Sequence, residues 1–316
     1  MTTTPFTIAD LAIVVVTYGS PDLLRTHLAP TAAGLPGATV VVVDNRRDDT
    51  SSESIRGIVE EHGWILMANS RNVGFGAAVD AGVARGRELG ASCFLILNPD
   101  ASIDRGGVLA LLKACEEPLT LASASIRRPD GSVWFDGADL HLKDGSTRST
   151  RRRGPTAPDE VMEWLTGACL MASWELWQTV GGFEPEYFLY WEDIDLSFRV
   201  LAAGGTLRVI QEAVAVHDVG GTQERDSQGL SGAYCYYNSR NRLVFAARNL
   251  DEAVARRWMR SSLPAAWDIV LRGGRRQLLH SRTPLWSALR GVRDGRRLAR
   301  AELRRRADAL GPVTDG

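Results

Sequence analysis

The residues best suited to chemistry in this sequence stand directly after apolar runs. Asp100 ends the turn Asn98-Pro99-Asp100, which follows the apolar run Phe94–Leu97. A carboxylate at the end of a buried strand can hold a hard divalent cation, which prefers oxygen ligands and can bridge a diphosphate. The alternative is a plain turn or a helix N-cap, because Asn-Pro-Asp is a common turn composition.

A second acidic group is Glu192-Asp193-Ile194-Asp195, which Tyr190 and Trp191 precede. Three acids in the first turn of a helix can act simply as caps and as partners of the helix dipole. The group also follows a loop, Gly181–Phe188, and has aromatic residues on both sides. In that setting one of its carboxylates could instead face a cleft.

A histidine stands in a third position of this kind. His217 follows the apolar run Leu207–Val216 and precedes Gly220-Gly221. A lone histidine is usually structural, but a histidine at a strand end with glycines after it can bind a metal or contact a phosphate.

Glycines also mark the segment Asn69–Gly82, which contains Gly74-Phe75-Gly76. Glycines there would let a nucleotide approach the backbone closely. The segment lacks the glycine spacing of a dinucleotide-binding fingerprint or of a P-loop. This absence argues against a dehydrogenase and against an NTPase.

Four short apolar runs, separated by helical patterns, must position these residues. They are Leu11–Val16, Val40–Val43, Trp64–Ala68 and Phe94–Leu97. Continuous apolar strands of this length predict an α/β fold with a parallel sheet buried on both faces. Ligands of such sheets bind at the carboxyl ends of the strands. We therefore expect the polar residues after the runs to converge on one edge: Thr17, Tyr18, Asp44, Asn45, Asn98 and Asp100.

The rest of the chain divides into three stretches. Residues Arg127–Pro158 are polar and predict a hairpin with a flexible loop. A helix is expected from Glu192 to the glycines at 204–205, because apolar residues then recur on one face. Beyond Asn238 the chain is expected to be helical and rich in arginine. We place the boundary between a catalytic domain, residues 1–237, and a basic helical extension, residues 238–316.

The charge distribution is uneven although the net charge is −1 over 316 residues. From Tyr236 to the end there are 18 arginines and 7 acidic residues, whereas residues 1–235 carry 19 basic and 31 acidic residues. A basic tail suggests an anionic partner such as a membrane surface or a lipid phosphate. The alternative is a solvated helical tail. The near-neutral total predicts no nucleic-acid partner.

The cysteines indicate a reducing compartment. None of Cys93, Cys115, Cys169 and Cys235 forms a C-x-x-C pair, so we expect reduced, buried thiols in a cytoplasmic protein. The N-terminal apolar run is too short for a signal peptide, and no apolar stretch approaches the ~20 residues of a membrane span. The basic tail, in which Trp258, Trp267 and Trp286 stand among apolar residues, is then the candidate contact with the inner face of the cell membrane. The competing hypothesis is that the tail folds back onto the acidic body.

The motifs together resemble those of glycosyltransferase family 2, and in particular its bacterial rhamnosyltransferase-like branch. The resemblance runs in order over residues 11–245, and Gly181–Arg199 is its most specific part. The matching segments are Val14–Tyr18, Val42–Asn45, Asn69–Gly82, Leu97–Asp100, Leu165–Ala172, Gly181–Arg199 and His217–Thr222.

The resemblance implies a GT-A fold, which is a Rossmann-like mixed, mostly parallel sheet flanked by helices, and transfer of a sugar with inversion. It implies that Thr17, Tyr18 and Asp44 border the nucleoside of a nucleotide diphosphate sugar. Asn72 and Gly74 would lie near the ribose or the diphosphate.

The resemblance also assigns the reacting end of the site. Asp100 would hold Mg²⁺ or Mn²⁺ with His217 as a second ligand, and Asn98 would border the donor. Asp193 would be the general base that deprotonates the acceptor hydroxyl, with Trp191 and Glu192 on the acceptor side.

Two departures from the family pattern affect the donor site. Asn98 occupies the first position of the family's Asp-x-Asp motif, so Asp100 is left as the carboxylate ligand there. Arg46-Arg47 follow Asp44-Asn45 where the family has small polar residues.

The activity expected is transfer of rhamnose from dTDP-rhamnose to a cell-envelope glycan or to a saccharide carried on a polyprenyl diphosphate. A galactofuranosyl- or other hexosyltransferase that uses a UDP-sugar is the alternative enzyme. A sugar-nucleotide-binding module without activity is a third hypothesis, against which the joint presence of Asp100, Asp193 and His217 argues. A nucleotidyltransferase is disfavoured because no Arg-rich loop follows the first strand. The oligomeric state stays open.

Overall fold

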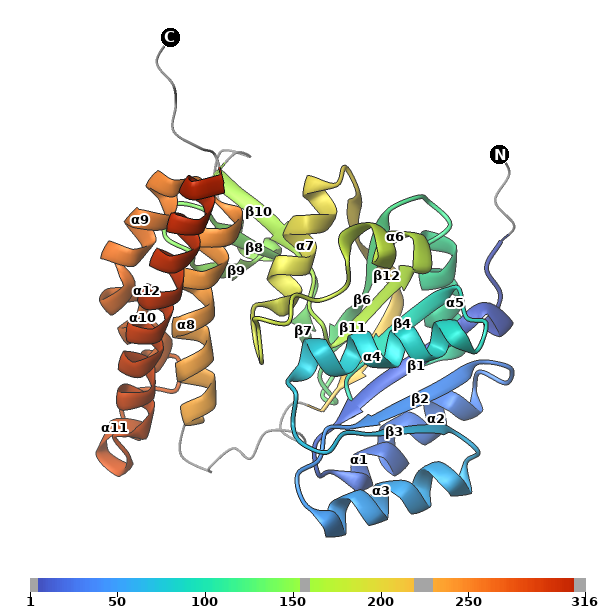
Figure 1. Cartoon of the computed structure of the whole chain (residues 1–316). Helices are drawn as coiled ribbons and strands as arrows, with labels where there is room; N and C mark the ends of the chain where they lie inside the picture. The colour runs from blue at the N-terminus through green and yellow to red at the C-terminus, as the bar shows by residue number, and fades with distance from the viewer. Residues whose placement is uncertain (1–4, 154–159, 219–229, 310–316) are drawn as a thin grey trace. The chain divides into compact units, whose positions relative to one another are not determined.

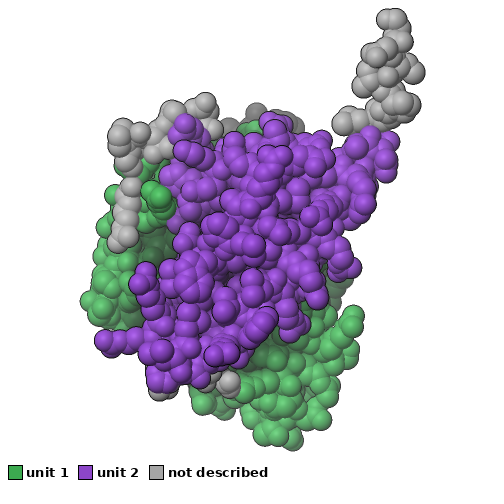
Figure 2. Space-filling model, turned by 90° about the vertical axis from the view of Figure 1, so that its left-hand side faces the viewer, with its two compact units in different colours: residues 1–139, 148–155, 163–222 green, residues 140–147, 156–162, 223–316 purple. Residues whose placement is uncertain are grey.

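The computed structural model describes residues 5–153, 160–218 and 230–309. The chain forms two compact units, which Figure 2 distinguishes by colour. Unit 1 comprises Met1–Asp139, Arg148–Pro155 and Glu163–Thr222. Unit 2 comprises Leu140–Thr147, Thr156–Met162 and Gln223–Gly316, so it takes in two segments from well before the expected boundary at residues 237–238.

The first half of unit 1 builds four parallel strands in the order β3-β2-β1-β4. Their bounds are β1 (Leu11–Thr17), β2 (Thr39–Asp44), β3 (Ile65–Ala68) and β4 (Cys93–Leu97). All four predicted apolar strands are thereby confirmed. Every residue of β1 and β4 is buried, as expected for strands that helices cover on both faces.

The second half of unit 1 continues the same sheet with strands of both directions. The order goes on from β4 to β11 (Cys169–Ser173), β6 (Thr120–Arg127), β12 (Thr206–His217) and β5 (Ala101–Ile103). β12 runs parallel to β6, whereas β11 is antiparallel to β4 and to β6. The predicted α/β class, with a Rossmann-like mixed sheet flanked by helices and an Arg-rich helical C-terminal part, is confirmed (Figure 1).

The helices of unit 1 bring loops to the carboxyl ends of the strands. They are α1 (Pro21–Leu23), α2 (Ala29–Ala33), α3 (Asp49–Glu61), α4 (Phe75–Glu88), α5 (Arg105–Ala114), α6 (Trp174–Val180) and α7 (Glu192–Ala202), with a π-helical turn at Leu24–Leu28. α4 packs closely on β1 and β2 through a small residue. A Cβ on Gly82 would lie 2.5 Å from Val14 Cγ1, so only glycine allows this approach.

The polar stretch after β6 contains more sheet than the sequence indicated. The expected hairpin is present, because β7 (Val133–Phe135) pairs antiparallel with β6. A separate three-stranded sheet in the order β10-β8-β9 was not predicted; its strands are β8 (Ala138–His141), β9 (Thr147–Ser149) and β10 (Val161–Trp164). The part of the expected flexible loop at residues 154–159 lies outside the described residues.

Unit 2 is built mainly from helices: α8 (Gly232–Asn249), α9 (Glu252–Arg260), α10 (Ser262–Leu271), α11 (Gln277–His280) and α12 (Thr283–Ala309). The long α12 runs beside α8 (Figure 1). Between α8, α10 and α12 lies a small core of Cys235, Ala266, Val270, Ala288 and Val292. All four cysteines of the chain are free and buried, as expected.

Trp258 anchors the early segment 140–147 to the helices of unit 2. It is fully buried, and its indole Nε1 donates a hydrogen bond to the Leu142 carbonyl at 2.9 Å. The guanidinium of Arg242 lies over the indole, 4.6 Å from the ring centroid. The prediction that Trp258 lies in a membrane interface together with Trp267 and Trp286 is therefore wrong for Trp258, because its ring fills the core instead.

The other two tryptophans of that prediction are exposed, Trp267 by 44% and Trp286 by 61%. In the part of the chain that the structure describes, no helix has the length and apolar character that crossing a bilayer requires.

Candidate active site

The carboxylate of Asp193 is held at the start of α7 by two backbone amides. Gly167 N donates to its Oδ2 at 3.1 Å, and Ile194 N donates to its Oδ1 at 2.9 Å. The helix starts here because Tyr190 and Trp191 both adopt left-handed backbone, with φ of 64° and 75°. Residues other than glycine hold this conformation only where the surrounding structure enforces it, and such positions cluster at functional sites.

Burial raises the pKa of both neighbouring acids. Loss of hydration raises the pKa of Asp193 to about 6, while the two amide hydrogen bonds oppose the rise. Burial also raises the pKa of Glu192 well above its ordinary value, and the charge of Asp193 adds to this shift. Near neutral pH, Asp193 is therefore mainly a carboxylate, whereas burial favours the neutral form of Glu192.

Exposure also separates the two acids. Asp193 is partly exposed to solvent, whereas Glu192 and Trp191 are only 6% and 5% exposed. The Oε2 atom of Glu192 has no hydrogen-bond partner among the described residues. Of these two acids, Asp193 is thus the one that solvent can reach.

Asp100 and His217 meet where the end of β12 lies beside the turn that precedes β5. His217 Nε2 lies 2.9 Å from Asp100 Oδ1, and both side chains are buried. The pairing of β12 with β5, which sets His217 opposite Ala101, brings them together. The ring of Trp134 packs edge-on against the imidazole, with 4.5 Å between the centroids.

These two side chains fit part of a metal site. Within residues 5–153, 160–218 and 230–309, no cluster of three or more His, Cys, Asp and Glu side chains is arranged to hold a metal. Asp100 and His217 offer oxygen and nitrogen ligands of the kinds that Mn²⁺ and Mg²⁺ accept. In the described structure, Nδ1 of His217 is buried without a hydrogen-bond partner. An ion held here would need further oxygen ligands from a bound molecule.

The loop between β10 and β11 links the two ends of the site. Gly167 N donates to Asp193, and the carbonyl of the next residue, Ala168, accepts from Asn98 N at 2.9 Å. The turn that carries Asp100 and the helix start that carries Asp193 are thus fixed by two consecutive residues. Asn98 Nδ2 also lies 3.5 Å from His217 Nε2.

The residues expected at the nucleoside lie together at the ends of β1 and β2. Thr17 and Asp44 are register partners in the two strands. Both are buried, and Asp44 Oδ1 accepts from Arg46 N at 3.0 Å. Thr17 Oγ1 has no hydrogen-bond partner in the described structure, while Tyr18 is 43% exposed.

Asn45 holds the neighbouring loop, a role that the sequence did not reveal. Its Oδ1 accepts from Asn69 Nδ2 and Val73 N at 3.1 and 3.0 Å. Its Nδ2 donates to Asn72 Oδ1 at 2.9 Å and to the Gly74 carbonyl at 3.1 Å. The position of Asn45 directly after a buried strand was the signal available in the sequence, but it does not specify these partners.

Gly74 is a contact point between two segments of the site. Its φ is 92°, and a Cβ on it would lie 2.6 Å from the Phe188 carbonyl oxygen. The amide of Phe75 donates to that same carbonyl at 2.9 Å. The start of α4 is therefore joined to the segment before α7. The close approach that Gly74 permits in this structure is to the Phe188 carbonyl of the protein itself.

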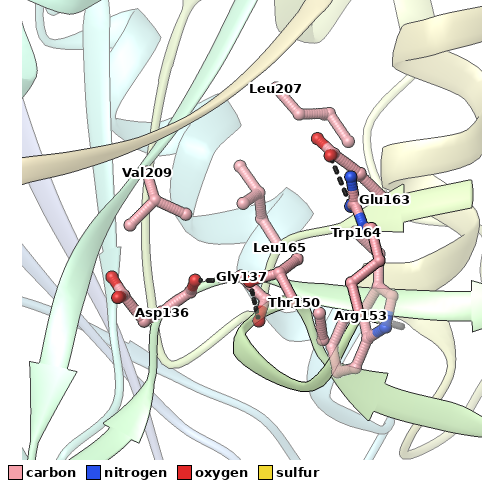
Figure 3. Close-up of a pocket in the computed structure, with 10 residues that line it drawn as sticks. Asp136, Gly137, Thr150, Arg153, Glu163, Trp164, Leu165, Leu207 and Val209 are labelled. Atoms are coloured by element: carbon pink, nitrogen blue, oxygen red, sulfur yellow. Dashed lines mark hydrogen bonds and ion pairs between the residues drawn. The ribbon is translucent and has the colours of Figure 1, made fainter. Parts of the chain in front are cut away.

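A cavity of about 300 Å³ lies in unit 1 beside the loop that holds Asp193. Figure 3 shows its lining, which includes Arg153, Glu163, Trp164 and Leu165. Arg153 Nη2 is paired with Asp139 at 2.5 Å and with Glu163 at 2.6 Å. The buried Nε1 of Trp164 has no hydrogen-bond partner in the described part of the chain.

The mixed, mostly parallel sheet flanked by helices is a GT-A type fold. The sequence profile described as "Glycosyl transferase family 2" matches residues 12–167, and that described as "Glycosyl transferase family group 2" matches residues 96–297. The chain belongs to glycosyltransferase family 2 and is a glycosyltransferase, as predicted.

Among similar sequences is N-acetylglucosaminyl-diphospho-decaprenol L-rhamnosyltransferase of Mycobacterium tuberculosis. It is 27% identical over 68% of this chain and 78% of that protein. Rhamnosyltransferase WbbL of Escherichia coli is 24% identical over 65% of this chain and 82% of its own length. These relatives bear out the resemblance to the rhamnosyltransferase-like branch.

Solved structures share the fold. GalNAc-T7 with UDP, GalNAc and Mn²⁺ aligns with a TM-score of 0.61 at 15% identity, over 82% of this chain and about half (51%) of that one. Mannosyltransferase PcManGT from Pyrobaculum calidifontis, with GDP-Man and Mn²⁺, aligns with a TM-score of 0.54 at 16% identity, over 97% and 87% of the two chains. At these identities the likeness concerns the fold.

Proposed function

We propose that this glycosyltransferase moves rhamnose from dTDP-rhamnose to a hydroxyl group of a cell-envelope saccharide carried on a polyprenyl diphosphate. The observation that carries the proposal is the placement of Asp193. Its carboxylate is fixed by Gly167 N, and the adjacent residue fixes the turn that carries Asp100. The rhamnosyltransferase relatives support the choice of sugar, and the decaprenol-dependent one supports the acceptor.

Asp193 acts as the general base. Its pKa of about 6 leaves it ionised at neutral pH, so it can take the proton of the acceptor hydroxyl. As the proton leaves, the hydroxyl oxygen bonds to the anomeric carbon, and the bond from that carbon to the diphosphate oxygen breaks. Attack comes from the face opposite the leaving group, which inverts the configuration. No covalent sugar–enzyme intermediate is needed.

Asp100 and His217 would hold a divalent ion, Mg²⁺ or Mn²⁺, beside the donor diphosphate. Such an ion supplies charge stabilisation to the departing diphosphate when it is bound. Asn98 borders the same group and keeps the Asp100 turn attached to Ala168. The Mn²⁺ present in two structures of the same fold supports the choice of ion.

The donor nucleoside lies against Thr17, Tyr18 and Asp44, with Asp44 accepting from the pyrimidine ring. The buried carboxylate of Asp44 and the unpartnered hydroxyl of Thr17 support this part of the proposal. Asn72 and Gly74 lie near the ribose or diphosphate and keep the loop after β3 in shape.

The acceptor approaches from the side of Trp191 and Glu192. We assign the cavity at Trp164 to its saccharide, because this cavity must lie close to Asp193. The backbone from Trp164 to Gly167 spans at most about 10 Å, and Gly167 N donates to the Asp193 carboxylate. Trp164 offers an apolar ring face and a free indole N–H, a combination that suits a sugar.

A panel of sugar nucleotides with a polyprenyl-diphosphate-linked GlcNAc acceptor tests the proposal, with products identified by mass spectrometry. We expect a mass gain of one deoxyhexose with dTDP-rhamnose only. Product from UDP-galactofuranose or another UDP-hexose would favour the alternative hexosyltransferase, and a lack of product with every donor would favour a sugar-nucleotide-binding module.

The enzyme is proposed to work at the inner face of the cell membrane, where such an acceptor is found. Exposed Trp267 and Trp286 together with the arginines of α12 suit a membrane interface. Each basic residue near an anionic surface contributes about 1 kcal/mol to binding.

A further inference from the structure

A groove of about 550 Å³ lies in unit 2, between α9 and α12. Five arginines line it: Arg256 and Arg260 from α9, and Arg296, Arg300 and Arg304 from α12. On each helix the arginines follow one another at a spacing of four residues. They therefore share one face of each helix.

The groove carries unbalanced positive charge. Its lining contains one carboxylate, that of Glu252, which is already paired with Arg256 at 2.5 Å. Arg260, Arg300 and Arg304 are exposed, and none of them has an ion pair among the described residues. Like charges four residues apart on a helix destabilise it, so this arrangement costs stability unless an anion is bound.

One guanidinium of the groove is held in place by neutral partners. Arg296 Nε donates to Ser262 Oγ at 2.8 Å and to the Met259 carbonyl at 3.2 Å. Its Nη2 donates to the same carbonyl at 3.1 Å. These contacts fix the group without neutralising its charge, which leaves the charge available to a ligand.

The geometry points to a phosphate-binding site, and we propose that the groove binds a phosphate or diphosphate group. Guanidinium groups match phosphate oxygens in two-pronged hydrogen bonds, and several of them around one site are suited to a multiply charged anion. Leu303 and Met259 add an apolar part to the lining, which suits the carbon chain of a phosphate ester.

The site is independent of the sugar transfer proposed above, because all of its residues belong to unit 2 and none is assigned to the reaction. The phosphate could belong to a soluble molecule or to a lipid headgroup. The chemistry of recognition is the same for both sources, so the experiment needs two arms.

The full-length protein is titrated with inorganic pyrophosphate by calorimetry, and its flotation is measured with phosphatidylcholine vesicles that contain or lack phosphatidic acid. The test variants are R300Q/R304Q on α12 and R260Q on α9. The matched control is R275Q/R276Q, which removes two exposed arginines of unit 2 outside the groove. Thermal unfolding checks that every variant folds.

We expect R300Q/R304Q to weaken binding by at least about tenfold and R260Q by about threefold or more, since each loses charge-assisted hydrogen bonds. The control should stay within about twofold of the wild type at matched ionic strength. A loss in the pyrophosphate arm alone identifies a soluble phosphate, and a loss in the vesicle arm alone identifies a headgroup. The proposal is overturned if neither probe binds, or if the control loses as much binding as R300Q/R304Q.

Discussion

Nε2 of His217 lies 2.9 Å from Oδ1 of Asp100, although 117 residues separate them in the chain. His217 is the last residue of β12 and Asp100 directly precedes β5, so the pairing of these two strands makes them neighbours. This contact places an imidazole nitrogen beside the carboxylate of the Asn98-Pro99-Asp100 turn.

Asp100→Ala should reduce metal-dependent donor binding strongly, and His217→Ala should reduce it more mildly. The carboxylate supplies a charged oxygen ligand, whereas the imidazole is neutral when it binds a metal. Calorimetry of dTDP-rhamnose binding with and without Mn²⁺ measures both effects. If the wild type binds the donor with the same affinity in EDTA as in Mn²⁺, the proposed metal site is wrong.

Asp193→Asn should lower turnover by roughly 10²- to 10⁴-fold, because a near-isosteric amide cannot accept the proton. Donor affinity should remain within a few-fold of the wild type. The matched control is Glu175→Gln, which removes an exposed carboxylate from the first turn of α6, outside the residues assigned to the site. We expect that control to keep most of its turnover. Near-normal turnover in Asp193→Asn would exclude Asp193 as the base.

The activity should depend on pH through Asp193. Only the carboxylate form can accept a proton, so kcat/KM should fall as the pH drops through about 6, the value to which burial raises the pKa of Asp193. Well below that pH the decrease should approach tenfold per pH unit. A pH–rate profile measures the midpoint, and a profile of the wild type that stays flat down to pH 5 would contradict the assignment.

The raised pKa of Asp193 should also make the free energy of unfolding depend on pH, in the direction opposite to the activity. The folded state binds the proton of Asp193 more tightly than the unfolded state, in which the ordinary value is 3.8. This contribution to the free energy of unfolding is fully present below that value and is lost as the pH rises through about 6. As the pH rises through about 6, the activity should therefore increase while this contribution to the free energy of unfolding is lost.

Gly74→Ala should destabilise the fold by about 1 kcal/mol or more, because its backbone is left-handed and the new methyl group would overlap the Phe188 carbonyl. Gly57→Ala is the control, since this glycine lies inside α3 with no atom near the added methyl group. Alanine there should stabilise the helix by about 0.5–1 kcal/mol. Urea unfolding measures both changes. A Gly74→Ala variant as stable as the wild type would show that Phe188 moves freely.

Trp258→Ala should cost about 3–5 kcal/mol of unfolding free energy, as expected for a fully buried tryptophan. Trp286→Ala should change it by less than about 0.5 kcal/mol, because this ring is exposed. In contrast, Trp286→Ala should reduce flotation with anionic vesicles more than Trp258→Ala does. Equal flotation of Trp286→Ala and the wild type would argue against a membrane role for this ring.

The sequence by itself determined the strands of the first half of the sheet and the polar residues at their ends. Apolar runs such as Leu11–Val16 are local patterns, and parallel strands of this kind must end at a common edge. Thr17, Asp44 and Asp100 could therefore be assigned to one edge without knowledge of their contacts. The start of α7 at Glu192 was likewise readable from spacing alone.

Tertiary structure decided which side chains meet. The hydrogen bonds of Asn45 to Asn69, Asn72 and Gly74, and the contact of Gly74 with Phe188, join segments whose separation in sequence carries no local signal. Trp258 looked like an interfacial tryptophan because its neighbours are arginines, yet it packs beneath Arg242 and binds Leu142. The physical reason is that burial depends on the order of strands and helices in space, which periodicity along the chain does not specify.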